Sequence, residues 1–146
     1  MKYELYLFGK KNSKSYHKKA IDEYMKRLSR YCKISCTIIG KQKEWEKAWA
    51  EHDQKVLVLP GKESVSSEEF SRMLGSFEMS GNSKLAYFIP DIITQKDWCE
   101  IVIRDKKDIH ILNLSDLSMG TGLCGVVLAE QIYRGYRILN NHPYHK

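Results

Sequence analysis

The chain alternates short apolar runs with longer segments in which apolar residues recur every three or four positions. The short runs are typical of strands, and the periodic segments are typical of helices. We expect strands over residues 3–8, 34–39, 55–59, 84–89 and 109–114, and helices over 15–31, 43–53, 66–79, 95–104 and 121–139. Strands that alternate with helices and are apolar on both faces predict an α/β fold, with a parallel sheet covered by helices.

The helix expected from residue 66 has a recognisable start. Ser66 and Glu69 form the pattern of a capping box, in which the Ser66 hydroxyl accepts from the Glu69 amide and the Glu69 carboxylate accepts from the Ser66 amide. No repeat, linker or low-complexity stretch interrupts the series of elements. We therefore expect residues 1–146 to form a single domain.

Composition narrows the class of protein. Apolar residues make up 42% of the chain and charged residues 29%, and no run approaches the roughly 18 apolar residues that a membrane span needs. The first eight residues have the pattern of a strand and not of a secretory signal. We expect a cytoplasmic protein that does not contact a membrane.

Cysteine and histidine usage gives no sign of a metal centre. The chain has four cysteines and no CxxC pair: Cys32, Cys36, Cys99 and Cys124. In a chain of this length they favour buried thiols over a disulfide framework. His142 and His145 could be combined with two of them only at spacings that common zinc fingers do not use. We expect no metal site.

The net charge of +6 is unevenly distributed. Residues 1–62 carry 15 basic and 7 acidic side chains, residues 63–120 carry 6 and 10, and residues 121–146 carry 3 and 1. The excess positive charge therefore lies towards the two ends of the chain. It favours a polyanionic partner if other features agree.

Two basic segments are candidates for binding nucleic acid. In the helix expected over 15–31, Lys18, Lys19, Lys26 and Arg30 fall opposite the apolar face. That face is either an ordinary solvated surface or one that binds phosphates. The tail, residues 133–146, interleaves tyrosine, histidine and cations such as Arg137. This mixture stacks bases and binds phosphates, although a frayed terminus can have the same composition.

Residues 120–125 match the GxGxxG pattern between a strand and a helix. A dinucleotide site also needs a further strand with an acidic residue about 20 positions on, and the chain ends 21 residues after Gly125. We favour glycines that permit a tight crossing or a close approach to a ligand, with an NAD site as the alternative. The helix that follows is apolar all round over 123–129, which predicts burial on every side, by threading or by a second subunit.

Several motifs together resemble one family, the ribosomal RNA large subunit methyltransferase H family of the SPOUT class. They are Asp22-Glu23-Tyr24, Leu59-Pro60-Gly61-Lys62, Ser66–Phe70, Leu112-Asn113-Leu114-Ser115, Glu130–Arg134 and Ile138–Lys146. The resemblance covers essentially the whole chain. It implies an α/β knot, with a C-terminal trefoil knot, and a homodimer. It also implies S-adenosylmethionine-dependent methylation of N3 of a pseudouridine in 23S rRNA.

The resemblance also assigns residues to the site. The cofactor wall would comprise Leu57, Pro90, Leu114, Ser115, Asp116, Leu117, Ser118 and Met119. The catalytic residues would be Arg134 and Tyr144, which position the base, and His145, which handles the proton. The surrounding rRNA or ribosome would be held by Lys18, Lys19, Lys26, Arg30 and Arg137.

The sequence departs from the family pattern at the expected cofactor site. Residues 90–94, Pro-Asp-Ile-Ile-Thr, stand where the family has a glycine-rich GGxxG loop. Gly120-Thr121 stands in place of Pro-His, and Gly125 in place of an arginine. Proline has no backbone donor and bulky residues keep a ligand at a distance. A homologue that binds rRNA or ribosomes without the cofactor is therefore the alternative hypothesis.

Overall fold

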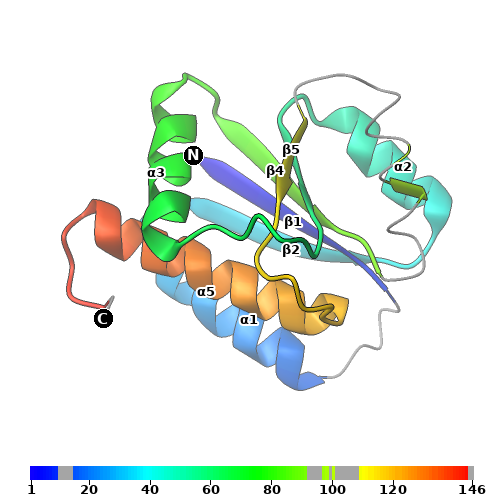
Figure 1. Ribbon diagram of the computed structural model, residues 1–146, viewed down its shortest axis with the longest axis horizontal. Helices are drawn as coiled ribbons and strands as arrows, with labels where there is room; N and C mark the ends of the chain where they lie inside the picture. Colours follow the sequence, from blue (N-terminus) through cyan, green and yellow to red (C-terminus); the bar gives the residue numbers. More distant parts are fainter. Residues whose placement is uncertain (10–14, 92–96, 99, 101–108, 145–146) are drawn as a thin grey trace.

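The computed structural model of the chain describes residues 1–9, 15–91, 97, 98, 100 and 109–144. Its five strands form one parallel sheet in the order β2-β1-β4-β3-β5 (Figure 1). The strands are β1 Lys2–Phe8, β2 Lys33–Ile39, β3 Lys55–Val58, β4 Lys84–Ile89 and β5 Ile109–Leu112. The helices are α1 Ser15–Leu28, α2 Gln42–Glu51, α3 Ser67–Met79 and α5 Thr121–Leu139. The predicted α/β class with a parallel sheet is confirmed.

Helices cover both faces of the sheet (Figure 1). Because side chains alternate along a strand, Leu5 and Leu7 of β1 pack on the side of α1, α3 and α5, in one core. On the other side, Phe8 and Phe88 join Trp45 of α2 in a second, aromatic core. Burial on both faces explains why the central strands are apolar without interruption.

Local signals place most elements correctly, with small differences at the ends. The capping box of α3 is confirmed, with both Ser66–Glu69 hydrogen bonds present. Helix α1 ends at Leu28, three residues earlier than predicted, because the Tyr31 amide donates to the Leu28 carbonyl at 2.8 Å in a turn. Strand β5 ends at Leu112 and not at residue 114. The helix expected over 95–104 falls largely outside the described residues.

Helix α5 crosses β1 and α1 at close range, and its glycines permit this. A Cβ at Gly125 would lie 2.8 Å from a methyl group of Leu7, and one at Gly122 would overlap the His17 ring. Gly120, at the N-cap, has nothing within 4 Å of that position. The interpretation of these glycines as residues that permit a tight crossing is confirmed for Gly122 and Gly125.

Within one chain α5 is not buried on every side, so the burial that the sequence predicts for its outer side would need a second subunit and stays a prediction. Its inner side is buried, including Cys124, Leu128 and Ile132. On its outer side Leu123 is 45% exposed, and Val127 is half-buried. The sheet, α1 and α3 cover the helix from within, and no element of the described chain covers the rest (Figure 1).

The far end of α5 is held by buried hydroxyl groups. The Tyr136 hydroxyl donates to the Glu78 carboxylate of α3 and lies 2.9 Å from the Tyr3 hydroxyl of β1. Both rings are almost completely buried. The last helix is therefore joined to the first strand by two buried hydroxyl groups, and to α3 by the exposed residue Glu78.

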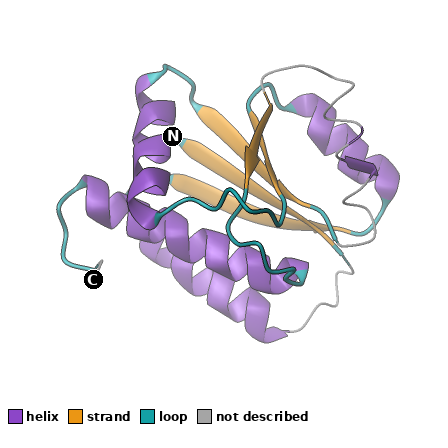
Figure 2. Ribbon diagram, in the orientation of Figure 1, coloured by secondary structure: helices purple, strands orange, loops and turns teal. Residues whose placement is uncertain are grey.

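A loop without regular structure, residues 113–120, joins β5 to α5 (Figure 2). It leaves the sheet at its carboxyl edge, passes the ends of β3 and β4, and starts α5 next to β1. The trefoil knot implied by the resemblance stays a prediction. Among the described residues, no helix is both long and apolar enough to cross a bilayer.

The close crossing of α5 generates a prediction about stability. Gly125→Ala places a methyl group against Leu7 and should lower the free energy of unfolding by about 1–3 kcal/mol. Gly120→Ala is the matched control, and should change it by less than about 1 kcal/mol because the N-cap position is open. Urea unfolding followed by circular dichroism measures both. Equal effects of the two substitutions would contradict the packing role of Gly125.

Candidate functional site

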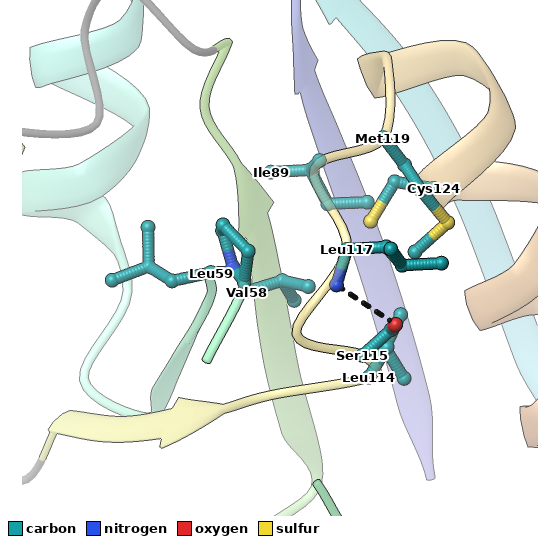
Figure 3. Close-up of a pocket in the computed structure, with 9 residues that line it drawn as sticks. Val58, Leu59, Ile89, Leu114, Ser115, Leu117, Met119 and Cys124 are labelled. Atoms are coloured by element: carbon teal, nitrogen blue, oxygen red, sulfur yellow. Dashed lines mark hydrogen bonds between the residues drawn. The ribbon is translucent and has the colours of Figure 1, made fainter. Parts of the chain in front are cut away.

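A narrow pocket lies where β3, β4 and β5 end (Figure 3). Its lining is mostly apolar and consists of Val58, Leu59, Pro60, Ile89, Leu114, Ser115, Leu117, Met119 and Cys124. The residues thus come from the ends of two central strands, the 113–120 loop and the first turn of α5. Open parallel sheets bind ligands at this edge.

Two hydrogen bonds tie the loop to the segment after β3, and a third lies within the loop. The Asn113 side-chain amide donates to the Leu59 carbonyl at 2.9 Å, and the Gly61 amide donates to the Ser115 carbonyl at 3.1 Å. Gly61 has to be glycine because a Cβ there would overlap the Asn113 side chain. The Leu117 amide donates to the Ser115 hydroxyl at 3.0 Å (Figure 3). The loop is therefore tied to β3 at its start.

The middle of the loop keeps its own polar groups available. Between described residues, no hydrogen bond engages the main chain of Asp116, Ser118 or Met119. The side chain of Leu117 is 75% exposed. This stretch can therefore bind a ligand through backbone donors and acceptors at little structural cost.

The structure brings half of the predicted cofactor residues together. Of the eight, Leu114, Ser115, Leu117 and Met119 line the pocket. Asp116 and Ser118 are exposed in the same loop, and Pro90 is buried directly after β4. Ile92, Ile93 and Thr94, where the sequence departs from the family, lie outside the described residues.

Leu57 does not line the pocket, unlike the prediction. Its side chain is completely buried in the aromatic core with Trp45 and Phe88, on the opposite face of the sheet. Alternation along β3 explains the difference, because adjacent residues of a strand point to opposite faces. The neighbouring residue Val58 lines the pocket instead.

A second cluster lies near the C-terminal end of α5. Arg134 donates to the Glu130 carboxylate through two nitrogens, at 2.8 and 3.0 Å, and its guanidinium lies 4.9 Å from the centre of the Tyr144 ring. The Tyr144 hydroxyl donates to the same carboxylate at 3.2 Å. Two predicted catalytic residues, Arg134 and Tyr144, are thus in contact. The third, His145, lies outside the described residues.

The contacts with Glu130 keep Arg134 and Tyr144 in their protonated forms. Burial and the Glu130 carboxylate raise the pKa of Tyr144 to about 12, and the hydrogen bond to Glu130 raises the pKa of Arg134. At neutral pH both side chains are therefore hydrogen-bond donors, and neither can accept a proton from a substrate.

Glu130 belongs to this cluster, although it is not among the residues that the resemblance assigns to the site. Glu130 and Arg134 are four residues apart on a helix, which is also the spacing of an ordinary surface ion pair. The structure adds two further donors to the same carboxylic group, Tyr144 and Gln131. Glu130 therefore orients the whole cluster.

Arg137 has an internal role where a contact with rRNA was predicted. It donates to the Tyr31 hydroxyl at 3.2 Å and to the Pro143 carbonyl at 3.0 Å. The Tyr31 hydroxyl is also 2.7 Å from Nδ1 of His142. These contacts fold the tail back onto the end of α1, so the tail is anchored and not frayed at these residues.

The cations predicted to bind RNA lie at the two ends of α1 and not on one continuous surface. Lys18, Lys19, Lys26 and Arg30 are all exposed. Lys18 and Lys19 are in the first turns of the helix, and Arg30 is in the turn that follows it. Fourteen residues of helix separate these ends by about 20 Å, so the four cations do not form one compact patch.

The thiols are poor candidates for chemistry. Burial raises the pKa of Cys32 to about 11, of Cys36 to about 11 and of Cys124 to about 12. Reactive cysteines need a lowered pKa. Within the described ranges, no group of three His, Cys, Asp or Glu side chains is arranged to hold a metal ion.

The pocket and the Arg134 cluster lie apart within one chain. Cys124 lines the pocket, and Arg134 is ten residues further along the same helix. At 1.5 Å per residue this corresponds to about 15 Å. One subunit therefore presents the two parts of the site at separate places.

Comparison with known proteins agrees with this architecture. A family described as "Predicted SPOUT methyltransferase" matches residues 1–145. "Ribosomal RNA large subunit methyltransferase H 1" of Thermoanaerobacter sp. (strain X514) is 35% identical over 146 residues, covering 100% of both chains. "Ribosomal RNA large subunit methyltransferase H" of Clostridium botulinum (strain Eklund 17B / Type B) is 36% identical, covering 93% of this chain and 94% of the relative.

The fold has also been seen in a solved structure. "The structure of a probable methylase family protein from Haemophilus influenzae Rd KW20" superposes with a TM-score of 0.51 at 11% identity, covering 99% of this chain and 70% of the other. At that identity the likeness concerns the fold alone. The full-length sequence matches carry the assignment: the chain belongs to the SPOUT methyltransferases and, among them, to the ribosomal RNA large subunit methyltransferase H family.

Proposed function

We propose that the protein transfers a methyl group from S-adenosylmethionine to N3 of a pseudouridine in 23S rRNA. The observation that carries the proposal is the pocket formed by the 113–120 loop at the carboxyl edge of a parallel sheet. The full-length relatives named as large-subunit rRNA methyltransferases support the substrate class.

The chemistry of the pocket suits this cofactor. Its apolar walls, among them Leu114, Leu117 and Met119, match an adenine ring and a methionine chain. Unpaired main-chain groups of residues 116, 118 and 119 can bind the polar edge of the adenine. The pocket volume of about 20 Å³ admits about one water molecule, so we propose that the middle of the 113–120 loop moves outward on binding and that Leu117 then packs on the ligand.

In the proposed mechanism, S-adenosylmethionine supplies an electrophilic methyl group, and the chain orients the nucleophile. Arg134 donates a hydrogen bond to a carbonyl oxygen of the pseudouridine ring, because it remains charged. The single Tyr144 proton is donated to Glu130, so Tyr144 positions the base through its ring. Glu130 holds the two side chains at a fixed separation. We assign removal of the N3 proton to His145, as the sequence predicted. Positioning of this kind supplies much of the rate in a displacement reaction.

We propose further that the protein acts as a homodimer, because the separation of about 15 Å along α5 places Arg134 away from the pocket of its own chain. Exposed apolar side chains lie at the starts of α1 and α5: Tyr16 is 58% exposed and Leu123 45%. Antiparallel pairing through a two-fold axis would cover these side chains and bring Arg134 of the partner subunit to the pocket.

Leu117 provides a test of the cofactor pocket. Leu117→Asp should weaken S-adenosylmethionine binding at least tenfold, because it puts a solvated charge into the apolar wall, and calorimetry measures the Kd. Met79→Asp is the control, since Met79 is 90% exposed and lies on α3, outside the pocket. No binding by the wild type would overturn the enzymatic proposal and favour the non-catalytic homologue.

The proposed shared site predicts complementation between two inactive variants. Arg134→Ala should lower methyl transfer to 23S rRNA about 100-fold, and Leu117→Asp should lower it by lost cofactor binding. Co-expressed, the two chains should regain about a quarter of wild-type activity, since half of the dimers would hold one complete site. Transfer of a labelled methyl group to ribosomes measures it, with Arg72→Ala on α3 as the control. Without recovery, the site lies within one subunit.

A further inference from the structure

We propose that the amino edge of the sheet carries a second RNA-binding site, a groove that holds phosphates of the rRNA away from the methyl-transfer pocket. The inference rests on the proposed rRNA substrate. The groove has a volume of about 540 Å³ and is lined by Met1, Lys2, Ser29, Arg30, Tyr31, Cys32, Lys33, Ser83 and Lys84. Four of these residues are cationic and none is acidic. We call it the amino-edge groove.

Three of the cations are direct neighbours in the sheet. The register pairs Lys2 of β1 with Lys33 of β2 on one side and with Lys84 of β4 on the other. Adjacent strands lie about 4.8 Å apart, so the three lysines form a row across the sheet. Like charges at directly opposed positions destabilise a sheet. Glu4 compensates part of this repulsion, and a polyanionic ligand would compensate the rest.

One carboxylate lies beneath the row and neutralises only part of it. Glu4 is within 3.4 Å of the Lys2 ammonium and 3.7 Å of that of Lys84. It is also bound by His52 at 2.9 Å and Tyr6 at 2.7 Å. Lys2 and Lys84 nevertheless keep 49% and 46% of their side-chain surface exposed. Glu4 thus holds the Lys2 and Lys84 side chains in place, while about half of the surface of each stays exposed and available to a ligand.

The groove continues into the part of the tail that the proposed mechanism uses. Tyr31 lines the groove, and Arg30 lies 5.9 Å from the centre of its ring. The Tyr31 hydroxyl contacts His142, two residues before Tyr144. A strand of RNA whose target base lies at Tyr144 can therefore follow the tail to the groove. Aromatic rings beside cations are typical of surfaces that track single-stranded RNA.

The position of the amino-edge groove separates RNA binding from methyl transfer. The cofactor pocket lies at the carboxyl ends of the strands, and the amino-edge groove lies at their opposite ends. Phosphate contacts there would fix the register of the rRNA without touching the reacting atoms. Loss of the groove should therefore raise the KM for ribosomes and leave both kcat and cofactor binding unchanged.

The test compares two triple variants that lose the same charge. Arg30→Gln/Lys33→Gln/Lys84→Gln removes three groove cations and leaves Lys2 paired with Glu4. The matched control, Lys41→Gln/Lys43→Gln/Lys47→Gln, removes three exposed cations at and near α2. Binding to 70S ribosomes is measured by cosedimentation over a range of salt concentrations, with calorimetry of S-adenosylmethionine binding in parallel.

We expect the groove variant to bind ribosomes at least tenfold more weakly, with its slope of log affinity against log salt smaller by about 2 to 3. The control should keep wild-type affinity. Equal affinities of the two variants would overturn the proposal that the amino-edge groove binds rRNA. Failure of the wild type to bind ribosomes would overturn both this proposal and the proposed rRNA substrate. Weaker binding by the groove variant, with no methyl transfer by the wild type, would support the groove and reject the enzymatic function.

Discussion

The packing of the last helix against the first strand is the constraint on which the rest of the structure depends. Near its start, α5 approaches β1 closely because Gly125 has no side chain to collide with Leu7. Near its end, the Tyr136 hydroxyl joins Tyr3 and Glu78. Burial raises the pKa of both tyrosines, so their hydroxyls keep their protons and the contact persists over a wide pH range.

This position of α5 determines where the functional groups lie. The helix begins at the pocket through Cys124 and carries Glu130 and Arg134 two to three turns later. A rigid helix keeps these two places apart, which is why the proposed site requires a second subunit. The end of α5 then directs the tail back onto Tyr31 and towards the amino edge of the sheet. One helix thus connects the proposed cofactor pocket, the base-positioning cluster and the phosphate groove.

Much of this could be predicted from the sequence where the signal is local. The capping box at Ser66 and the alternation of strands and helices depend on neighbours in the chain. The glycine pattern predicts a close approach at Gly125, but its partner Leu7 is distant in the sequence. The resemblance alone assigns Leu57 to the cofactor wall, and its side chain packs in the aromatic core, away from the pocket. The register that aligns Lys2 with Lys33 and Lys84 depends on tertiary pairing. No spacing in the sequence indicates that row.

The central claim is that a cofactor binds between the 113–120 loop and the ends of β3 and β4. A crystal structure with S-adenosylhomocysteine tests it most directly. We expect density for the adenosyl group against Leu114 and Met119, with Leu117 packed on it and Arg134 of the partner subunit facing the pocket. Density along the opposite side of the 120–125 glycines, between α1 and β2 next to His17, would contradict the account.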